Sequence, residues 1–294
     1  MHSWLLVSKY TSIKRLLYSI LLNAVSTYTQ KPKQQSIEVK KNLLYKGRDN
    51  RKIFYISGVA QHLSKSHNSM TMEIANGIGT QLSATSGEVV NVKIVPPGLI
   101  YLELTHPCLA TWLQNLAIAC AIQDEKMEIS ENTNQKPNSK NQNLLNLFAV
   151  QYAHARCFSL LRLAHQEGLI KLKEVPINGL EVWQLEFPQP IPWLNNDNQL
   201  RLYHPTEGYL IAQLVQIVDD LVCSDVSETI NWQKAALGLS RAFENFWSQC
   251  RIWDEIKTTS PELAQARLGL VMATGRLLQV LLLEKLGSFA PLEL

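Results

Sequence analysis

Histidine and cysteine are the residue types in this sequence most able to bind a metal or act as a nucleophile, yet their spacing supports neither chemistry. The five cysteines include no Cys-x-x-Cys pair, which argues against a zinc site and a disulfide framework. The seven histidines are scattered; His62 and His67 are not four positions apart and have no cluster of cysteines or carboxylates beside them. Phosphate-binding loops and the common hydrolase signatures are missing. We therefore expect no metal, no cofactor and no catalytic residue, and reduced thiols in a cytoplasmic protein. The residues considered are His2, His62, His67, His106, His154, His165, His204, Cys108, Cys120, Cys157, Cys223 and Cys250.

Acidic side chains offer no paired carboxylates for acid–base chemistry. Asp219 and Asp220 are adjacent, and side chains at successive positions of a helix do not face each other. We therefore expect this pair to lie on a solvated helix face. Asp124, Glu125 and Glu128 belong to a polar stretch that has no apolar residues to hold them in a fixed geometry.

The segment 144–166 has the most informative pattern of polar side chains. At about 100° per residue, one broad arc of this predicted helix contains Gln151, His154, Ser159, Arg162, His165 and Gln166. The opposite side contains Leu145, Ala149, Leu160 and Leu163, together with Arg156. A buried guanidinium needs a partner, so we expect a structural role for Arg156 in a salt bridge to a neighbouring helix. For Gln151, His154 and Arg162, an ordinary helix surface and a ligand-binding face both remain open.

Length and composition indicate two domains with apolar cores. The chain has 294 residues, of which 46% are hydrophobic and 18% charged. It has no run of the roughly 18–20 uninterrupted apolar residues that a transmembrane helix needs, so we expect no membrane segment. The net charge of +3 is unevenly distributed, because residues 1–52 hold 11 Lys and Arg against 2 Asp and Glu, whereas residues 144–294 carry a net charge of −4. The basic arm at 31–52 is open to two interpretations, a solvated loop or a contact with RNA.

The N-terminal half predicts an α+β domain over residues 1–122, in which helices pack on a small antiparallel sheet. Apolar residues at helical spacing predict helices over 13–27 and 69–82, and a further helix over 105–122 begins beside Pro107. Alternation predicts strands over 89–95 and 99–104, joined by a Pro-Pro-Gly turn. Residues 123–143 lose nearly all apolar character and predict a flexible polar linker.

The C-terminal half, residues 144–294, predicts an all-α bundle with a small β-rich insertion. Helices are expected over 144–166, 208–222, 229–250 and 261–286; the last has Ser260 as N-cap and Gly287 after its end. Short strands are expected over 169–175, 182–187 and 200–203.

Several segments resemble parts of arginyl-tRNA synthetases. Residues 147–164, LFAVQYAHARCFSLLRLA, resemble the opening helix of the DALR anticodon-binding domain of that family, with residues 151–156 as the most specific part. Residues 237–253, LGLSRAFENFWSQCRIW, resemble its helix ending in an aromatic-aromatic-x-x-Cys pattern, and residues 263–294 resemble its closing helix and tail. Residues 55–82 and 92–104 resemble the additional N-terminal domain of those enzymes.

The resemblance implies two RNA contacts. In the family, anticodon bases enter a pocket formed by the opening helix, an aromatic residue after the cysteine-containing helix, and the C-terminal end. The positions here that this implies are Gln151, Tyr152, His154, Arg162, Trp253 and Leu294. The N-terminal domain of the family touches the outer corner of tRNA, which implies Asn76 and Gln81 together with Lys40, Lys41, Arg48 and Arg51 of the basic arm. Unstacked bases bind by stacking on aromatic rings and by hydrogen bonds to their edges, which suits these residue types.

The chain departs from the family between the two resembling regions. The synthetases have a large ATP-binding catalytic domain there, whereas this chain has about twenty polar residues, fewer than the roughly 30 of a single βαβ unit. We therefore expect a non-catalytic tRNA-binding protein rather than an active ligase. The alternative is a regulatory module that has kept the scaffold and binds a protein partner, or a second copy of itself, through the apolar segment Leu277–Leu286 of the C-terminal helices.

Overall fold

The computed structural model describes residues 11–30, 43–49, 51–67, 70–118, 140–177, 180–223 and 230–293. Some predictions concern residues outside these ranges, namely Lys40, Lys41, Leu294 and most of the linker at 123–143. The chain forms two compact units. The first comprises Met1–Thr111 and Val218–Asp225, and the second comprises Trp112–Ile217 and Val226–Leu294.

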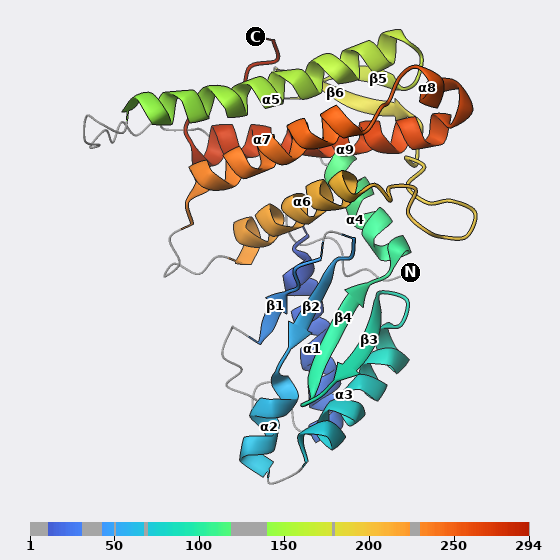
Figure 1. The fold of residues 1–294 in the computed structure, drawn as a ribbon, viewed down its shortest axis with the longest axis vertical. Coiled ribbons are helices and arrows are strands. Elements are labelled where there is room, and N and C mark those ends of the chain that lie inside the picture. Colours follow the sequence, from blue (N-terminus) through green and yellow to red (C-terminus); the bar gives the residue numbers. More distant parts are fainter. Residues whose placement is uncertain are drawn as a thin grey trace. The chain divides into compact units, whose positions relative to one another are not determined.

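The first unit is a four-stranded antiparallel sheet backed by helices, as predicted for an α+β domain (Figure 1). The strands are β1 (Leu44–Lys46), β2 (Phe54–Ser57), β3 (Val90–Val95) and β4 (Leu99–Leu104), in the order β1-β2-β4-β3. The helices are α1 (Ile13–Thr29), α2 (Val59–His67), α3 (Thr71–Ser86) and α4 (His106–Ile118), the last of which begins in this unit. The short strands β1 and β2 were not predicted from the sequence.

Burial alternates along the strands because one face of the sheet packs against helices. Ile100, Leu102 and Leu104 of β4 are buried, whereas Tyr101 and Glu103 between them are only half-buried. Figure 1 shows α1 and α3 on the same side of the sheet, and this is the side where the core lies. The other side of the sheet carries Tyr45, Phe54 and Tyr101, which we call the open sheet face.

The prediction that Asp219 lies on a solvated face is wrong. Asp219 is 4% exposed, and its Oδ1 accepts hydrogen bonds from Ser12 Oγ at 2.7 Å and from the backbone N–H of Lys14 at 3.0 Å. Tyr55 donates to its other oxygen. The carboxylate therefore caps the first turn of α1, where free N–H groups attract negative charge. Burial raises the pKa of Asp219, and it lowers the pKa of the nearby Lys46 to about 8.

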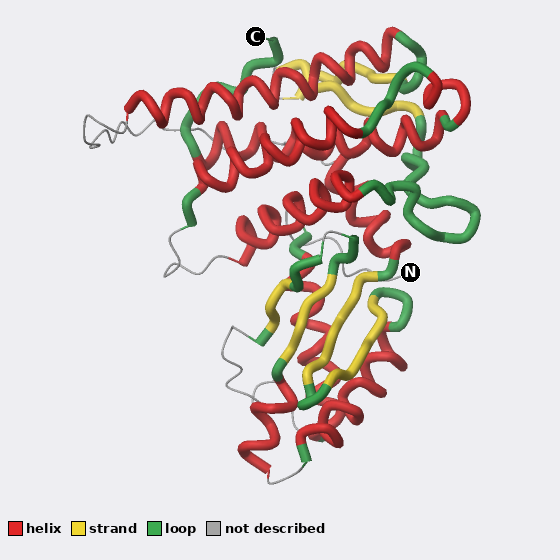
Figure 2. The backbone as a smooth tube through the Cα atoms, viewed as in Figure 1, coloured by secondary structure: helices red, strands yellow, loops and turns green. Residues whose placement is uncertain are grey.

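The second unit is mostly helical, as predicted. It contains α5 (Lys140–Gln166), most of α6 (Pro205–Cys223), α7 (Trp232–Gln249), α8 (Glu255–Thr259) and α9 (Pro261–Val280), which a π-helical segment, Leu281–Lys285, continues. Helices α5, α7 and α9 lie side by side (Figure 2). The β-hairpin of β5 (Lys171–Ile177) and β6 (Leu180–Phe187) is the predicted β-rich insertion.

Three details of the second unit differ from prediction. Residues 200–203 form no strand, and Leu200 makes only an isolated bridge to Leu194, because the intervening turn is held by the Asn195 side chain. The short helix α8 was not predicted. The α-helical geometry of α9 ends at Val280, and Gly287, with φ 56°, follows the π-helical segment that extends it.

The apolar segment proposed as a partner surface belongs to the core, so that part of the alternative interpretation is wrong. Leu277, Leu278, Leu281 and Leu282 are fully buried. The stretch Pro261–Lys285 is long and apolar enough to cross a membrane, yet 89% of its apolar window is buried inside the protein, as expected of a core helix.

Candidate functional site

An aromatic and cationic stripe runs along the exposed side of α5. Phe148 and Tyr152 are one turn apart, their rings stack with centroids 6.5 Å apart, and they are 56% and 48% exposed. Arg156 lies a further turn along, because residues four apart share a helix face. We call Phe148, Tyr152 and Arg156 the aromatic stripe. Two exposed rings that stack on each other form an apolar surface on which a flat partner could stack.

Arg156 contacts a ring instead of the predicted carboxylate. Its guanidinium lies 5.3 Å from the centroid of the Trp247 ring on α7, a cation–π contact. No ion pair of Arg156 occurs among the residues that the structure describes. The expected link to a neighbouring helix is therefore present, but its chemistry differs.

Trp247 in turn contacts Trp253, and together they form the tryptophan pair. The two rings meet edge to face with centroids 5.5 Å apart. Trp253 is half-buried, and within the described chain its buried indole N–H has no hydrogen-bond acceptor. The aromatic stripe and the tryptophan pair are thus connected through Arg156.

The three polar candidates on α5 lie on a neighbouring stripe that is occupied by the chain's own tail, residues 288–293. Gln151 Nε2 donates to the carbonyl oxygen of Phe289 at 2.9 Å, and Arg162 Nη2 donates to that of Leu292 at 3.2 Å. Arg162 also pairs with the carboxylate of Glu293. We call Gln151, His154 and Arg162 the polar stripe.

The sequence placed His154 on a polar helix face, but in the structure it does not lie on an exposed surface. It is fully buried, and its Nδ1 donates to the carbonyl oxygen of Pro291 at 2.7 Å. The imidazole packs against Phe158 with ring centroids 4.8 Å apart, and its Nε2 is buried without a partner in the described chain. Burial lowers the pKa of His154, although the hydrogen bond to Pro291 opposes this. The neutral ring therefore serves as an anchor for the tail.

Two arginines of this unit are buried and have partners inside the protein. Arg267 and Arg276 of α9 are each 8% exposed. Arg267 pairs with Glu207, and Arg276 donates to the carbonyl oxygen of Trp183. By contrast, Arg241 on α7 and Arg251 after it are exposed.

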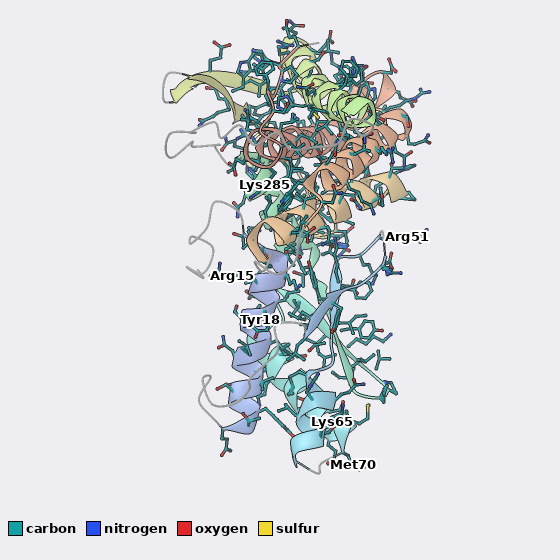
Figure 3. The ribbon with its side chains drawn as sticks, turned by 90° about the vertical axis from the view of Figure 1, so that its left-hand side faces the viewer. Arg15, Tyr18, Arg51, Lys65, Met70 and Lys285 are labelled. Carbon is teal, nitrogen blue, oxygen red and sulfur yellow. The ribbon has the colours of Figure 1, made fainter. Side chains whose placement is uncertain are left out.

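The candidates of the first unit fall on two different sides of the sheet. Asn76 is exposed and Gln81 half-buried on α3, on the helical side. Arg48 and Arg51 are exposed between β1 and β2, and Figure 3 shows Arg51 on the side of the sheet away from Arg15 and Tyr18 of α1. The sequence did not draw attention to the open sheet face, where Phe54 and Tyr101 stack with centroids 5.7 Å apart and Tyr45 is 61% exposed.

Comparison with known proteins identifies a family for much of the second unit. A family model described as "DALR anticodon binding domain" matches residues 150–287, which include α6, α7, α9 and most of α5. The C-terminal region carries a DALR anticodon-binding domain. The aromatic stripe begins just before the matched part of this DALR domain, and the tail follows it.

Curated relatives carry the name arginine–tRNA ligase. The chain is 30% identical to the enzyme of Synechococcus sp. (strain JA-3-3Ab) over 48% of its length, 32% to that of Gloeobacter violaceus over 45%, and 33% to that of Moorella thermoacetica over 49%. These alignments cover 21%, 20% and 22% of the respective enzymes, so the chain matches about a fifth of each relative. No solved structure gives a significant match. The family match comprises the DALR domain alone and includes no catalytic domain.

Proposed function

We propose that this protein binds tRNA, with the anticodon loop on the aromatic stripe and tryptophan pair of the DALR domain, and that it does not aminoacylate the RNA. The observation that carries the proposal is the exposed stack of Phe148 and Tyr152, followed along α5 by Arg156. Aromatic rings and guanidinium planes are the surfaces on which splayed RNA bases stack.

The polar stripe has a supporting role in this proposal. Gln151, His154 and Arg162 hold the tail, and the tail borders the helix that carries the exposed rings. Because these side chains already hydrogen-bond to the tail, we expect the bases to be held by stacking on the aromatic stripe instead of by these side chains. Each stacked base contributes about 1–3 kcal/mol.

In this proposal, the phosphate groups of the RNA contact exposed arginines in each of the two units. The net charge of residues 144–294 is −4, and the buried Arg267 and Arg276 have partners inside the protein. Arg241 and Arg251 are exposed cations in and just after α7, and Arg48 and Arg51 are exposed cations of the first unit. Since each phosphate contact releases counterions, binding should weaken steeply with salt.

In the first unit, the open sheet face suits RNA better than Asn76 and Gln81 do. It combines the Phe54–Tyr101 stack and the exposed Tyr45 with Arg51 at the connection between β1 and β2. Four-stranded sheets that display aromatic rings bind unpaired bases in other RNA-binding modules. We therefore assign the outer-corner contact to this face.

The direct test is fluorescence anisotropy with labelled arginine tRNA and, separately, with its isolated anticodon stem-loop. We expect both RNAs to bind at about 50 mM salt and to lose affinity as salt rises. Replacing Tyr45 with Ala should weaken binding of the full tRNA and leave the stem-loop unaffected. Failure of both RNAs to bind at low salt would refute the proposed function.

The absence of aminoacylation has its own test. Arginine-dependent exchange of pyrophosphate into ATP reports amino-acid activation, and we expect none from this chain with or without tRNA. Exchange above that of a heat-inactivated control would show that the chain contains an ATP site and would contradict this part of the proposal.

A further inference from the structure

The segment Cys250–Trp253 leaves α7 and turns into α8, and its backbone is tied down at several points. The N–H of Cys250 donates to the carbonyl oxygen of Phe246 at 2.8 Å, and its Sγ lies 3.2 Å from Thr206 Oγ1. Cys250 and Ile252 are each 1% exposed. The carbonyl oxygen of Arg251, two residues before Trp253, accepts a hydrogen bond from Nη1 of Arg267 at 2.5 Å.

Arg267 is itself fixed by a buried ion pair. Its Nε donates to Glu207 Oε1 at 2.7 Å, where Glu207 is fully buried and Arg267 is 8% exposed. The other carboxylate oxygen, Oε2, accepts from the backbone N–H of His204 at 2.8 Å, immediately before α6. The ion pair of Glu207 and Arg267 therefore connects two segments. Glu207 holds the start of α6, and the guanidinium of Arg267 reaches from Glu207 to the backbone before Trp253.

Trp253 has no polar anchor of its own among the described residues. Its indole N–H is buried without an acceptor, and its ring contact is the edge-to-face packing on Trp247. The direction of the ring is therefore set by the backbone of residues 250–252. That backbone is held in turn by Arg267.

We propose that Arg267, oriented by Glu207, is the positioning residue that sets Trp253 against Trp247 for base stacking. The RNA part of this inference rests on the proposed function, whereas the geometry of the tryptophan pair does not. Arg267 touches no RNA in this scheme and acts through the Arg251 carbonyl group.

The substitution Arg267→Lys separates positioning from general stability. A lysine keeps a positive charge beside Glu207, but its single ammonium lacks the second arm that reaches Arg251. The matched control is Arg276→Lys, because Arg276 lies on the same helix, is also 8% exposed and also donates to a backbone carbonyl group, that of Trp183. Glu207→Gln is a second way to loosen the Arg267 fork if the lysine variant folds poorly.

The first readout is a double-mutant cycle on affinity for the anticodon stem-loop. Trp253→Ala and Arg267→Lys should each weaken binding by roughly 5- to 150-fold, the range for one stacked base. The combined variant should bind no more weakly than Trp253→Ala alone, because the positioning residue has nothing left to position. Arg276→Lys should keep wild-type affinity. Additive losses in the combined variant would overturn the inference.

The second readout does not need RNA. Two tryptophan rings in edge contact give a coupled pair of far-ultraviolet circular dichroism bands, which Trp253→Phe should remove. We expect Arg267→Lys or Glu207→Gln to weaken this signal and Arg276→Lys to preserve it at matched thermal stability. An unchanged signal in both Arg267→Lys and Glu207→Gln would refute positioning by Arg267, whereas lack of RNA binding by the wild type, with the expected spectra, would refute only the proposed function.

Discussion

Two neighbouring stripes of α5 contain the candidate residues, and the protein uses them differently. The aromatic stripe, which includes Phe148 and Tyr152, is exposed, whereas the polar stripe of Gln151, His154 and Arg162 is occupied by the tail. The polar side chains hydrogen-bond to the tail, except at Nε2 of His154, whereas the rings of Phe148 and Tyr152 stay exposed in the described part of the chain. Polarity alone is therefore a poor guide to which face of this helix is exposed, since polar side chains are also buried where they find hydrogen-bond partners.

The largest effect should come from removing the exposed rings. The double substitution Phe148→Ala/Tyr152→Ala should weaken binding of the anticodon stem-loop up to about a hundredfold, because stacked bases lose their support. Leu163→Ala is the matched control, since Leu163 is also on α5 and is 40% exposed. Anisotropy measurements in which the control loses as much affinity as the double variant would assign binding to another face.

The next effect should be on stability and should come from the polar stripe. Replacing His154 with Ala removes a buried hydrogen-bond donor to the tail and leaves the Pro291 carbonyl group unsatisfied. We expect the free energy of unfolding in urea to fall by about 1–3 kcal/mol. The exposed Gln166 at the end of α5 provides the control, because Gln166→Ala should change it by less than about 0.5 kcal/mol. Equal effects of the two variants would show that the tail anchor is unimportant.

The buried histidine also predicts a pH dependence. Burial holds the pKa of His154 below its ordinary value of 6.5, so the unfolded chain takes up a proton before the folded chain does. Stability should therefore fall as pH drops below about 6.5, and the loss should be smaller in His154→Gln, which cannot titrate. Urea unfolding of both proteins at pH 7.5 and pH 5.5 checks this. Parallel losses in the two proteins would mean that other groups are responsible.

The smallest effect should come from the exposed end of the polar stripe. Arg162 and Glu293 form an ion pair with side chains 30% and 75% exposed, and such surface pairs contribute less than about 1 kcal/mol. Arg162→Ala should therefore leave stem-loop affinity within about twofold of the wild type, as expected for a group already engaged by the tail. A loss comparable to that of the aromatic variant would mean that Arg162 leaves the tail to contact RNA.

The sequence predicted the class of fold and most helices, because long periodic segments carry a strong signal. It misjudged the rotation of α5. The face against the core consists largely of small residues such as Ala153, Cys157 and Ala164, which periodicity weights little. They are buried because α9 comes close at Gly275, where an added Cβ would lie 3.0 Å from that of Cys157. His154 is buried where it contacts Pro291 of the tail and Phe158, and Leu163 is left 40% exposed.

Long-range partners account for the remaining errors. The burial of Asp219 depends on Ser12 and Tyr55, and no local pattern could bring these residues together. The contact between Arg156 and Trp247 could not be predicted either. The spacing of Phe148, Tyr152 and Arg156 at every fourth position could have indicated that they share one helix face. The short strands β1 and β2 have three and four residues, too few for alternation to be distinctive.

The cap of α1 has a consequence for how the chain matures during synthesis. Ser12 and Asp219 are 207 positions apart, so the ribosome must add about two hundred residues before the first helix receives its acceptor. At about 5–20 residues per second, this delay lasts on the order of 10–40 s. A nascent chain arrested at residue 122 would hold Tyr55 and Ser12 without the carboxylate that both use in the finished protein.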